Sequence, residues 1–175
     1  MTNTPTDRRV YPDAEKLPDR KQRIYDFLHE HPVGVLSSSM PDGNPHGVVV
    51  YFSVDETLTV RFLTKKDTRN YDNLKHSAHV ALTIFDTHTQ TTVEFVGVAT
   101  ECGSAADINE AAKDVFVASA PAGANGLPPI AKLQADAFTA FQLSPVQIRM
   151  AMYAQPDIGN YRALFETVEA FDLND

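Results

Sequence analysis

The residues best suited to binding chemistry lie in one short stretch, FLTKKDTRNYDN, at positions 62–73. Residues 61–75 hold five of the chain's 15 lysines and arginines against two acids, although the whole protein carries a formal net charge of −8. Thr64 and Thr68 stand four residues apart, and Arg69 follows directly. If a helix begins near Asp67 or Thr68, its free N–H groups point toward the end of the preceding strand. Such an end favours a phosphate group, with the hydroxyls and the guanidinium completing the site.

Two features of the same stretch leave another interpretation open. Asp67 would repel a phosphate unless its carboxylate turns away to cap the helix. On spacing alone, a solvated and cation-rich turn that binds nothing is the simpler interpretation. The chain has no glycine-rich phosphate loop, which argues against a Walker-type nucleotide site and against a Rossmann dinucleotide site.

The elements that must position this stretch are short strands and helices. Ile24, Phe27 and Leu28 recur with helical spacing and predict an amphipathic helix that Asp19 caps and Pro32 ends. A helix is expected over residues 67–76, and Ser104 with Asp107 forms a capping pair for another. Tyr161, Leu164, Phe165 and Val168 suggest a final helix. Alternating apolar residues predict seven strands, at 33–39, 46–54, 58–64, 79–86, 91–102, 137–143 and 146–152.

These strands follow one another through short turns rather than through repeated βαβ units. The sequence therefore predicts a mostly β fold, an antiparallel barrel of about seven strands with three or four short helices at its ends or on one side. Residues 1–18 are polar and contain three prolines, so we expect an N-terminal arm. Residues 19–175 are expected to form a single domain.

Composition narrows the classes of function. The acidic balance argues against nucleic acid as a partner and gives no attraction to anionic membranes. No stretch approaches the roughly 20 apolar residues of a membrane span. The single cysteine, Cys102, excludes an intrachain disulfide and fits a reducing compartment, so a soluble cytoplasmic protein is expected. The histidine pairs 29/31 and 76/79 lack further ligands at suitable spacing, and no metal site is predicted.

The order of these pieces resembles the pyridoxamine 5′-phosphate oxidase-like family of FMN-binding split barrels. The resemblance covers roughly residues 20–152. It runs from the N-terminal helix through MPDGNPHG, VVVYF and VRFLTKKDTRNYDNLKHSAHVALTIF to TTVEFVGVATEC and LSPVQIRM. Its most specific part is the stretch 63–74, and the rest is similar at the level of pattern.

The resemblance implies a set of cofactor-binding residues. Thr64, Thr68 and Arg69 match the cluster that holds the flavin phosphate, and Lys65 stands where a further phosphate contact is possible. Asn70 occupies a position where many members have lysine. The remaining residues of the set are expected along the ribityl chain and the ring: Leu63, Val48, Val49, Val50 and Thr92, the last where the oxidases themselves have glutamine. The resemblance also implies a homodimer whose two chains share each FMN.

The C-terminal tail departs from the family's substrate-binding pattern. True pyridoxamine phosphate oxidases end in a motif with arginine and histidine, whereas this tail holds Arg162 and no histidine follows His88. The resemblance therefore implies an FMN-dependent oxidoreductase that acts on a different small molecule, with no catalytic residue identified. Two alternatives stay open: a non-enzymatic flavin- or haem-binding or stress-response module, and a deazaflavin-dependent reductase.

Overall fold

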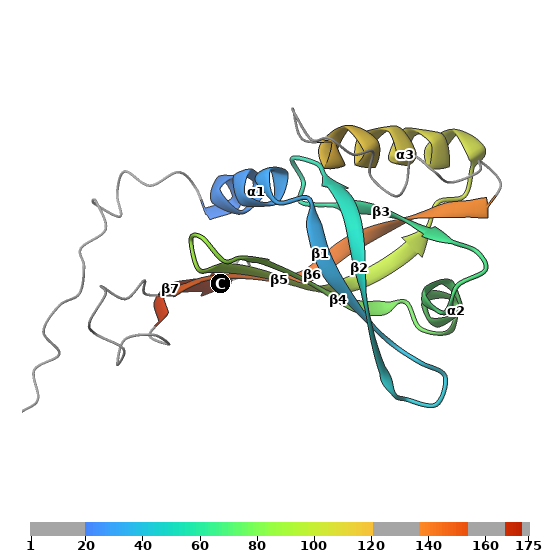
Figure 1. Ribbon diagram of the computed structural model, residues 1–175, viewed down its shortest axis with the longest axis horizontal. Coiled ribbons are helices and arrows are strands. Elements are labelled where there is room, and N and C mark those ends of the chain that lie inside the picture. The colour runs from blue at the N-terminus through green and yellow to red at the C-terminus, as the bar shows by residue number, and fades with distance from the viewer. Residues whose placement is uncertain (1–19, 121–136, 154–166, 173–175) are drawn as a thin grey trace, which may run out of the picture.

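The computed structural model describes residues 20–120, 137–153 and 167–172, so the predicted arm at 1–18 lies outside the described residues. Three helices and seven strands follow one another along this part of the chain (Figure 1). The helices are α1 (Arg20–Glu30), α2 (Arg69–His76) and α3 (Ala105–Ser119). The strands are β1 (Val33–Ser39), β2 (Pro45–Val54), β3 (Val60–Lys65), β4 (His79–Asp86), β5 (Thr91–Glu101), β6 (Phe138–Tyr153) and β7 (Thr167–Asp172).

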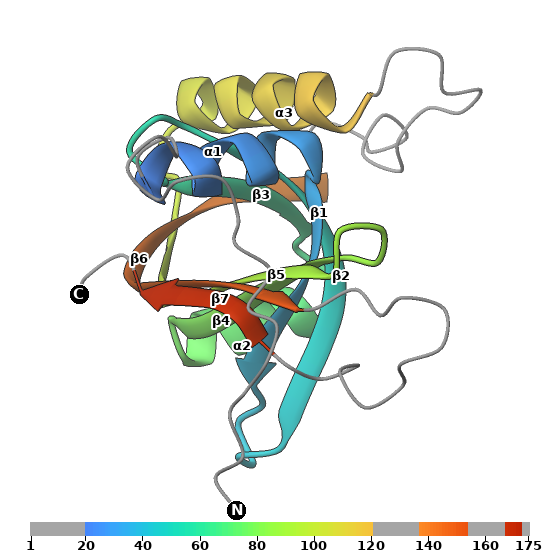
Figure 2. The same cartoon turned by 90° about the vertical axis from the view of Figure 1, so that its left-hand side faces the viewer.

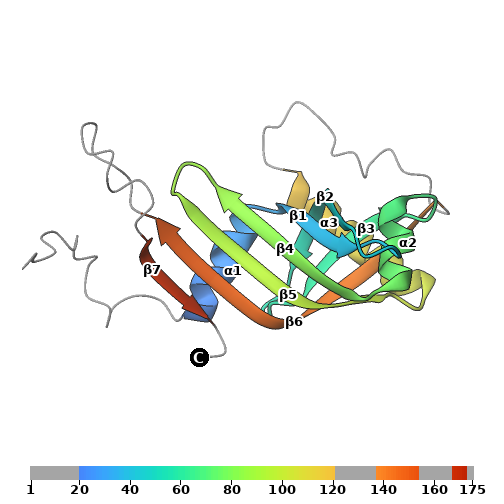
Figure 3. The same ribbon diagram turned by 90° about the horizontal axis from the view of Figure 1, so that it is seen from below.

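The strands form one antiparallel sheet that closes into a barrel. Their order is β3-β2-β1-β4-β5-β6-β7, and a further pairing of β3 with β6 closes a ring of six strands. Strand β7 adds to the far half of β6 and stays outside the ring, as Figure 3 shows from below. Helices α1 and α3 lie on the same side of the barrel, whereas α2 lies at its end (Figures 1 and 2). The prediction of a mostly β split barrel is confirmed.

The barrel interior follows from strict alternation along the strands. In β1 every second residue is buried, and the same pattern recurs through β3, β4 and β5. Helix α1 closes one side of the core with Ile24, Phe27 and Leu28, the three residues whose spacing predicted it. It ends at Glu30, two residues before Pro32. Among the described helices, none is long and apolar enough to cross a membrane.

The two predicted strands at 137–143 and 146–152 are one strand. Strand β6 runs through Ser144 and Pro145, and its register with β5 shifts between Val96 and Gly97. A β-bulge accommodates an extra residue and bends the strand, so a proline at this point ends no element. The single strand thereby serves both the barrel, through β3, and the extension that carries β7.

Two other sequence-based predictions are wrong. Residue 58 does not begin a strand: Leu58 is buried in the turn before β3, with a positive φ of 63° that leucine rarely adopts. The final helix is also wrong where the structure describes the chain, because Val168 belongs to strand β7. The other residues that suggested that helix lie outside the described residues. Tertiary pairing with β6 overrides the helical spacing there.

Gly97 is the position where the bulge tolerates no side chain. A Cβ atom at Gly97 would overlap the carbonyl oxygen of Ser144 and lie 3.1 Å from the Cα of Pro145, both on the facing strand. We predict that Gly97→Ala lowers the free energy of unfolding by about 1–3 kcal/mol, because two backbones must move apart. Gly103→Ala is the matched control, since a Cβ there meets nothing within 4 Å. Equal urea midpoints for the two variants would contradict this account.

The turn between β4 and β5 is held by one carboxylate. Asp86 accepts hydrogen bonds from the Thr89 hydroxyl at 2.6 Å, from the Thr89 backbone N–H at 2.8 Å and from the His88 backbone N–H at 3.2 Å. These bonds favour the ionised form and lower the pKa of Asp86 from 3.8 to about 2.

This pKa shift has a definite consequence for acid stability. A carboxyl group whose pKa is lower in the folded state stabilises the fold above its unfolded pKa and loses that effect as the pH falls through the folded pKa. We predict that the turn weakens between pH 3.8 and about 2. An NMR titration of the Asp86 carboxyl carbon measures this pKa directly. Thr89→Val removes the hydroxyl and is expected to raise the pKa; an unchanged titration curve would contradict the assigned cause.

Candidate functional site

The predicted phosphate-binding stretch forms the corner where β3 passes into α2. Thr68 is the N-cap of α2, and its hydroxyl accepts a hydrogen bond from the backbone N–H of Tyr71. Asp67 therefore does not cap the helix; its carboxylate lies 3.4 Å from the Lys65 ammonium. Tyr71 packs edge-on against Phe141 of β6, which fixes the helix on the barrel end.

Hydrogen bonds connect the polar side chains of this corner. Thr64 is only 7% exposed, and its hydroxyl oxygen lies 3.4 Å from that of Thr68. The Thr68 hydroxyl donates to the Lys65 carbonyl at 2.7 Å. Asn70 is 5% exposed and donates from Nδ2 to the Thr64 hydroxyl at 3.1 Å. Asn70, predicted as a contact on the cofactor side, thus points inward and supports Thr64.

The five cations of residues 61–75 divide into two groups. Arg61 pairs with Asp114 at 3.1 Å, Lys65 with Asp67 at 3.4 Å, and Lys75 with Glu101 at 3.0 Å. The bond to Glu101 raises the pKa of Lys75. Lys66 and Arg69 are exposed and form no ion pair with any described residue. These two cations, on either side of the Thr68 cap, give the corner its remaining positive charge.

The two strands beside the corner separate from each other, which leaves a gap between them. Strand β2 pairs with β3 only from Phe52 to Val54, whereas β3 continues along β6 to Lys65. In Figure 1 the rest of β2 turns away with β1 as a projecting hairpin. The N–H of Phe52 bonds to the carbonyl of Pro32, before β1. By alternation, Val49 directs its backbone groups to the opposite edge, toward this gap.

The predicted ring-binding residues face different ways. The side chain of Val49 lies on the outer face of the barrel and is 61% exposed, whereas Val50 is 5% exposed and Val48 packs partly against the core. Leu63 is half-buried, facing away from the core in β3. Within this set, Val49 therefore combines an accessible side chain with backbone groups that face away from β1, whereas the backbone groups of Val48 and Val50 face β1.

Thr92 lies far from the corner within one chain. Thr64 pairs with Thr139 on β6, and Thr92 pairs with Ala151 on the same strand. These partners stand twelve residues apart along β6, roughly 40 Å of extended strand. Figure 1 places α2 and the β4–β5 turn at opposite ends of the barrel. A single chain does not bring Thr92 together with Thr64, Thr68 and Arg69.

The sequence analysis missed a second amide of α2, on Asn73. It is 1% exposed and donates to the Ser38 hydroxyl of β1 at 3.1 Å. Asn70 and Asn73 are three residues apart and share the inner face of the helix with Leu74. Asparagines at helical spacing beside a buried leucine are the signal that would have revealed this inward polar face.

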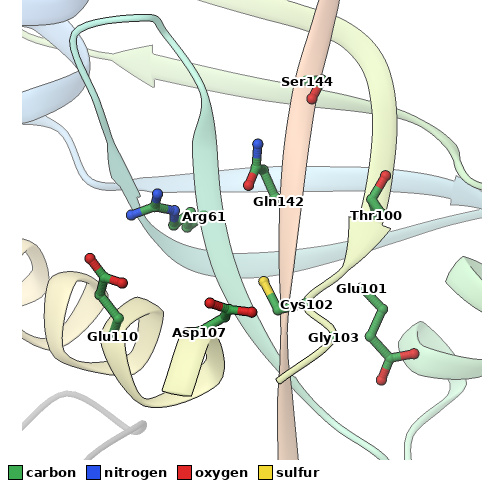
Figure 4. A pocket seen from close by; sticks show the side chains of 9 residues that line it. All are labelled: Arg61, Thr100, Glu101, Cys102, Gly103, Asp107, Glu110, Gln142 and Ser144. Atoms are coloured by element: carbon green, nitrogen blue, oxygen red, sulfur yellow. The ribbon is translucent and has the colours of Figure 1, made fainter. Parts of the chain in front are cut away.

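Two cavities lie elsewhere, against helix α3. One, of about 530 Å³, is lined by residues of β2, β3 and α3, including Val54 and Val117. The other, of about 370 Å³, contains Cys102 and is shown in Figure 4, where Arg61, Asp107 and Glu110 border the same space. Burial, and next the charge of Asp107, raises the pKa of the Cys102 thiol. A raised pKa disfavours the reactive thiolate, so this cavity is a poor nucleophilic site.

The remaining kind of site, a metal centre, concerns the described ranges 20–120, 137–153 and 167–172. In those ranges no three histidine, cysteine, aspartate or glutamate side chains gather as a metal site would require. The candidate site of this chain is thus the corner of Thr64, Thr68 and Arg69, which we call the phosphate corner. Its hydroxyls, amide and unpaired cations suit an anion.

Comparison with solved structures supports the same fold. A candidate pyridoxamine 5′-phosphate oxidase from Listeria innocua is 22% identical with a TM-score of 0.60, over 75% of this chain and 98% of that one. A heme binding protein from Mycobacterium smegmatis is 15% identical with a TM-score of 0.64, over 89% of this chain and 58% of that one. A pyridoxamine 5′-phosphate oxidase-related, FMN binding protein from Nostoc punctiforme is 15% identical with a TM-score of 0.57, over 91% and 100%.

The fold is a split barrel whose strand-to-helix junction carries two hydroxyls and exposed cations. The sequence profile of the pyridoxamine 5′-phosphate oxidase family matches residues 21–151, most of the 175-residue chain. The chain therefore belongs to this family. Among curated proteins, none matches it.

Proposed function

We propose that this protein is a homodimeric FMN-binding protein that acts as a flavin-dependent oxidoreductase on a small molecule. The observation that carries the proposal is the phosphate corner, in a chain of this family. When bound, FMN would supply the redox chemistry through its ring, and the protein would bind and orient it. The related Nostoc punctiforme protein is itself described as FMN binding.

The residues of the corner fit the phosphate end of FMN. Arg69 and Lys66 are exposed cations without ion pairs among the described residues, beside the N-terminus of α2. A helix N-terminus with adjacent hydroxyls and a guanidinium binds a phosphate dianion through charge-assisted hydrogen bonds. Lys65 contributes less charge because Asp67 lies against it. Thr64, Thr68 and Arg69 are therefore proposed to hold the phosphate.

An apolar outer face fits both the flavin ring and a second copy of the chain. Five large apolar side chains are exposed on β1, β2, β4 and β5, all pointing away from the core: Val33, Val35, Val49, Phe85 and Val96. Val35 stands opposite both Val49 and Thr83 in the sheet, and Thr83 stands opposite the exposed Glu94, so polar residues interrupt the apolar side chains of this face. Several large apolar side chains exposed on one face of a sheet are typical of an interaction surface.

A dimer also accounts for the separation of the predicted site residues. Thr92 and Val49 both face outward, but Thr92 lies at the opposite end of β6 from the phosphate corner. We propose that the apolar face joins two chains, and that each FMN lies between the phosphate corner of one and outward residues of the other, Thr92 among them. Leu63 on β3 and the backbone of Val49, on the edge of β2 that faces β3, would line this site, with Val48 and Val50 as the neighbours of Val49 on the strand.

The substrate is proposed to differ from pyridoxamine 5′-phosphate, because no histidine follows His88 in the sequence. The alternatives are a binding module without turnover and a deazaflavin-dependent reductase, and haem is a further ligand to test since one structural relative binds it. Reducing the bound flavin and following its reoxidation distinguishes a binding module from an oxidoreductase. The reduced flavin of a binding module reacts with no acceptor besides oxygen.

The absorbance spectrum of the purified protein tests the cofactor. Bound oxidised FMN is expected to give two absorbance bands, at about 375 and 450 nm, whereas a single band at about 420 nm indicates deazaflavin or haem. We predict about one FMN per chain, carried from expression or gained on addition. A protein that neither carries nor binds any flavin contradicts the proposal.

Arg69→Ala tests the phosphate corner within the same prediction. Loss of one charge-assisted phosphate contact is expected to weaken FMN binding by about 1.5–3 kcal/mol, measured by quenching of flavin fluorescence. Lys21→Ala removes an equally exposed cation on α1 and is the matched control. Equal FMN affinities for the two variants would place the phosphate elsewhere.

The proposed dimer is tested by charge on the apolar face. Val35→Glu puts a carboxylate in the middle of that face and is expected to give a monomer in analytical ultracentrifugation, with loss of FMN binding because each site needs both chains. Val117→Glu is the control, since Val117 on α3 is 66% exposed, more than the 43% of Val35. A dimeric Val35→Glu protein would show that this face is not the interface.

A further inference from the structure

We propose that Asn70 is a positioning residue that fixes the Thr64 hydroxyl as a hydrogen-bond donor toward the phosphate of the cofactor. The inference rests on the proposed function, and it assigns a role to a buried amide at a position where, by the resemblance, many family members have lysine. Asn70 lies on the inner face of α2, 5% exposed, with Nδ2 at 3.1 Å from the Thr64 hydroxyl oxygen.

The direction of each hydrogen bond in the corner follows from its partners. The Lys65 carbonyl only accepts, so the Thr68 hydroxyl hydrogen is committed to it at 2.7 Å. The Thr68 oxygen therefore acts as an acceptor, both from the Tyr71 N–H and from Thr64. Asn70 donates to Thr64, so the Thr64 oxygen accepts on that side. The hydrogen bonds therefore run in one direction: Asn70 donates to Thr64, Thr64 donates to Thr68, and Thr68 donates to the Lys65 carbonyl, which accepts.

This order leaves the Thr64 hydroxyl hydrogen as the weakly held one. Its partner in the corner is the Thr68 oxygen at 3.4 Å, at the long limit of a hydrogen bond. A phosphate oxygen can accept this hydrogen without breaking a short bond, whereas capturing the Thr68 hydrogen would break the 2.7 Å bond to Lys65. Thr64 is thus the proposed hydroxyl donor, and Thr68 acts mainly as the helix cap.

Asn70 contributes by occupying the inward side of the Thr64 oxygen. Without the amide, the Thr64 hydroxyl can rotate, and its hydrogen is no longer directed along the corner. The Asn70 carbonyl oxygen, Oδ1, is buried with no hydrogen-bond partner among the described residues. A buried unpartnered oxygen is costly, and its retention is explained if the N–H side of the amide is needed at Thr64.

The chain supplies a matched control in Asn73. Its Nδ2 donates to the Ser38 hydroxyl at the same 3.1 Å, and its Oδ1 is likewise buried without a partner. Both amides attach α2 to a strand end, but Asn73 makes its bond to β1 rather than to the phosphate corner. If Asn70 only anchored the helix, replacing Asn70 or Asn73 by alanine would therefore have the same effect on FMN binding.

The test compares the affinities of FMN and riboflavin, which differ by the phosphate alone. We expect Asn70→Ala to weaken FMN binding about tenfold and to leave riboflavin binding within about twofold. Thr64→Val is expected to cause a similar loss for FMN, and the double variant no further loss, because the two side chains act through one contact. Asn73→Ala is expected to change both affinities by the same factor. Asn70→Asp, which accepts the Thr64 hydrogen instead, is expected to weaken FMN more than Asn70→Ala does.

Each contrary outcome has a distinct meaning. Equal losses for FMN and riboflavin in Asn70→Ala, or additive losses with Thr64→Val, overturn the positioning role while leaving FMN binding intact. Unchanged FMN affinity in Asn70→Asp overturns it as well, and this nearly isosteric variant keeps the test valid if Asn70→Ala does not fold. A wild-type protein that binds neither flavin refutes the proposed function first, and with it this inference.

Discussion

The pairing of β3 with β6 is the constraint on which the rest of the structure depends. Strand β3 shares three residue pairs with β2 and six with β6, so the barrel closes through β6 rather than through a longer β2–β3 ladder. Closure leaves the first half of β2 free to turn away with β1. It also directs the end of β3 past the last residue that pairs with β2, to the point where α2 begins and the phosphate corner forms.

Positive charge gathers at the corner although the whole protein is acidic. Three of its neighbouring cations pair with carboxylates, and the two that pair with none among the described residues, Lys66 and Arg69, stand beside the helix cap. Beneath them, Asn70 and Asn73 replace apolar side chains on the inner face of α2 and bond to strand hydroxyls. Buried amides pack less well than apolar side chains, but their hydrogen bonds fix the orientation of the groups that they contact. A binding site depends on this fixed orientation more than a hydrophobic core does.

The outer face and the inner core arise from the same alternation. Residues that pack inside leave their neighbours outside, and on β1, β2, β4 and β5 those neighbours include large apolar side chains. Exposed apolar side chains on four strands suit the dimer interface proposed above. The proposed dimer covers this face. It would also bring Thr92 of one chain close to the phosphate corner of the other, whereas the two lie far apart within one chain. Membership of the family fits this proposed arrangement. The choice of substrate would then depend on the residues that border the proposed shared site.

The sequence by itself determined most of the secondary structure and the place of the corner. Alternation set the strands, the helical spacing of Ile24, Phe27 and Leu28 set α1, and local charge with two threonines indicated the corner that we propose as an anion site. These signals are local, so they survive without tertiary information. Only the tertiary structure decided that β6 continues through Pro145, that Val168 joins a strand, and that Asn70 turns inward to Thr64. Each of these depends on a partner distant in sequence, whose packing and hydrogen bonds outweigh local propensity.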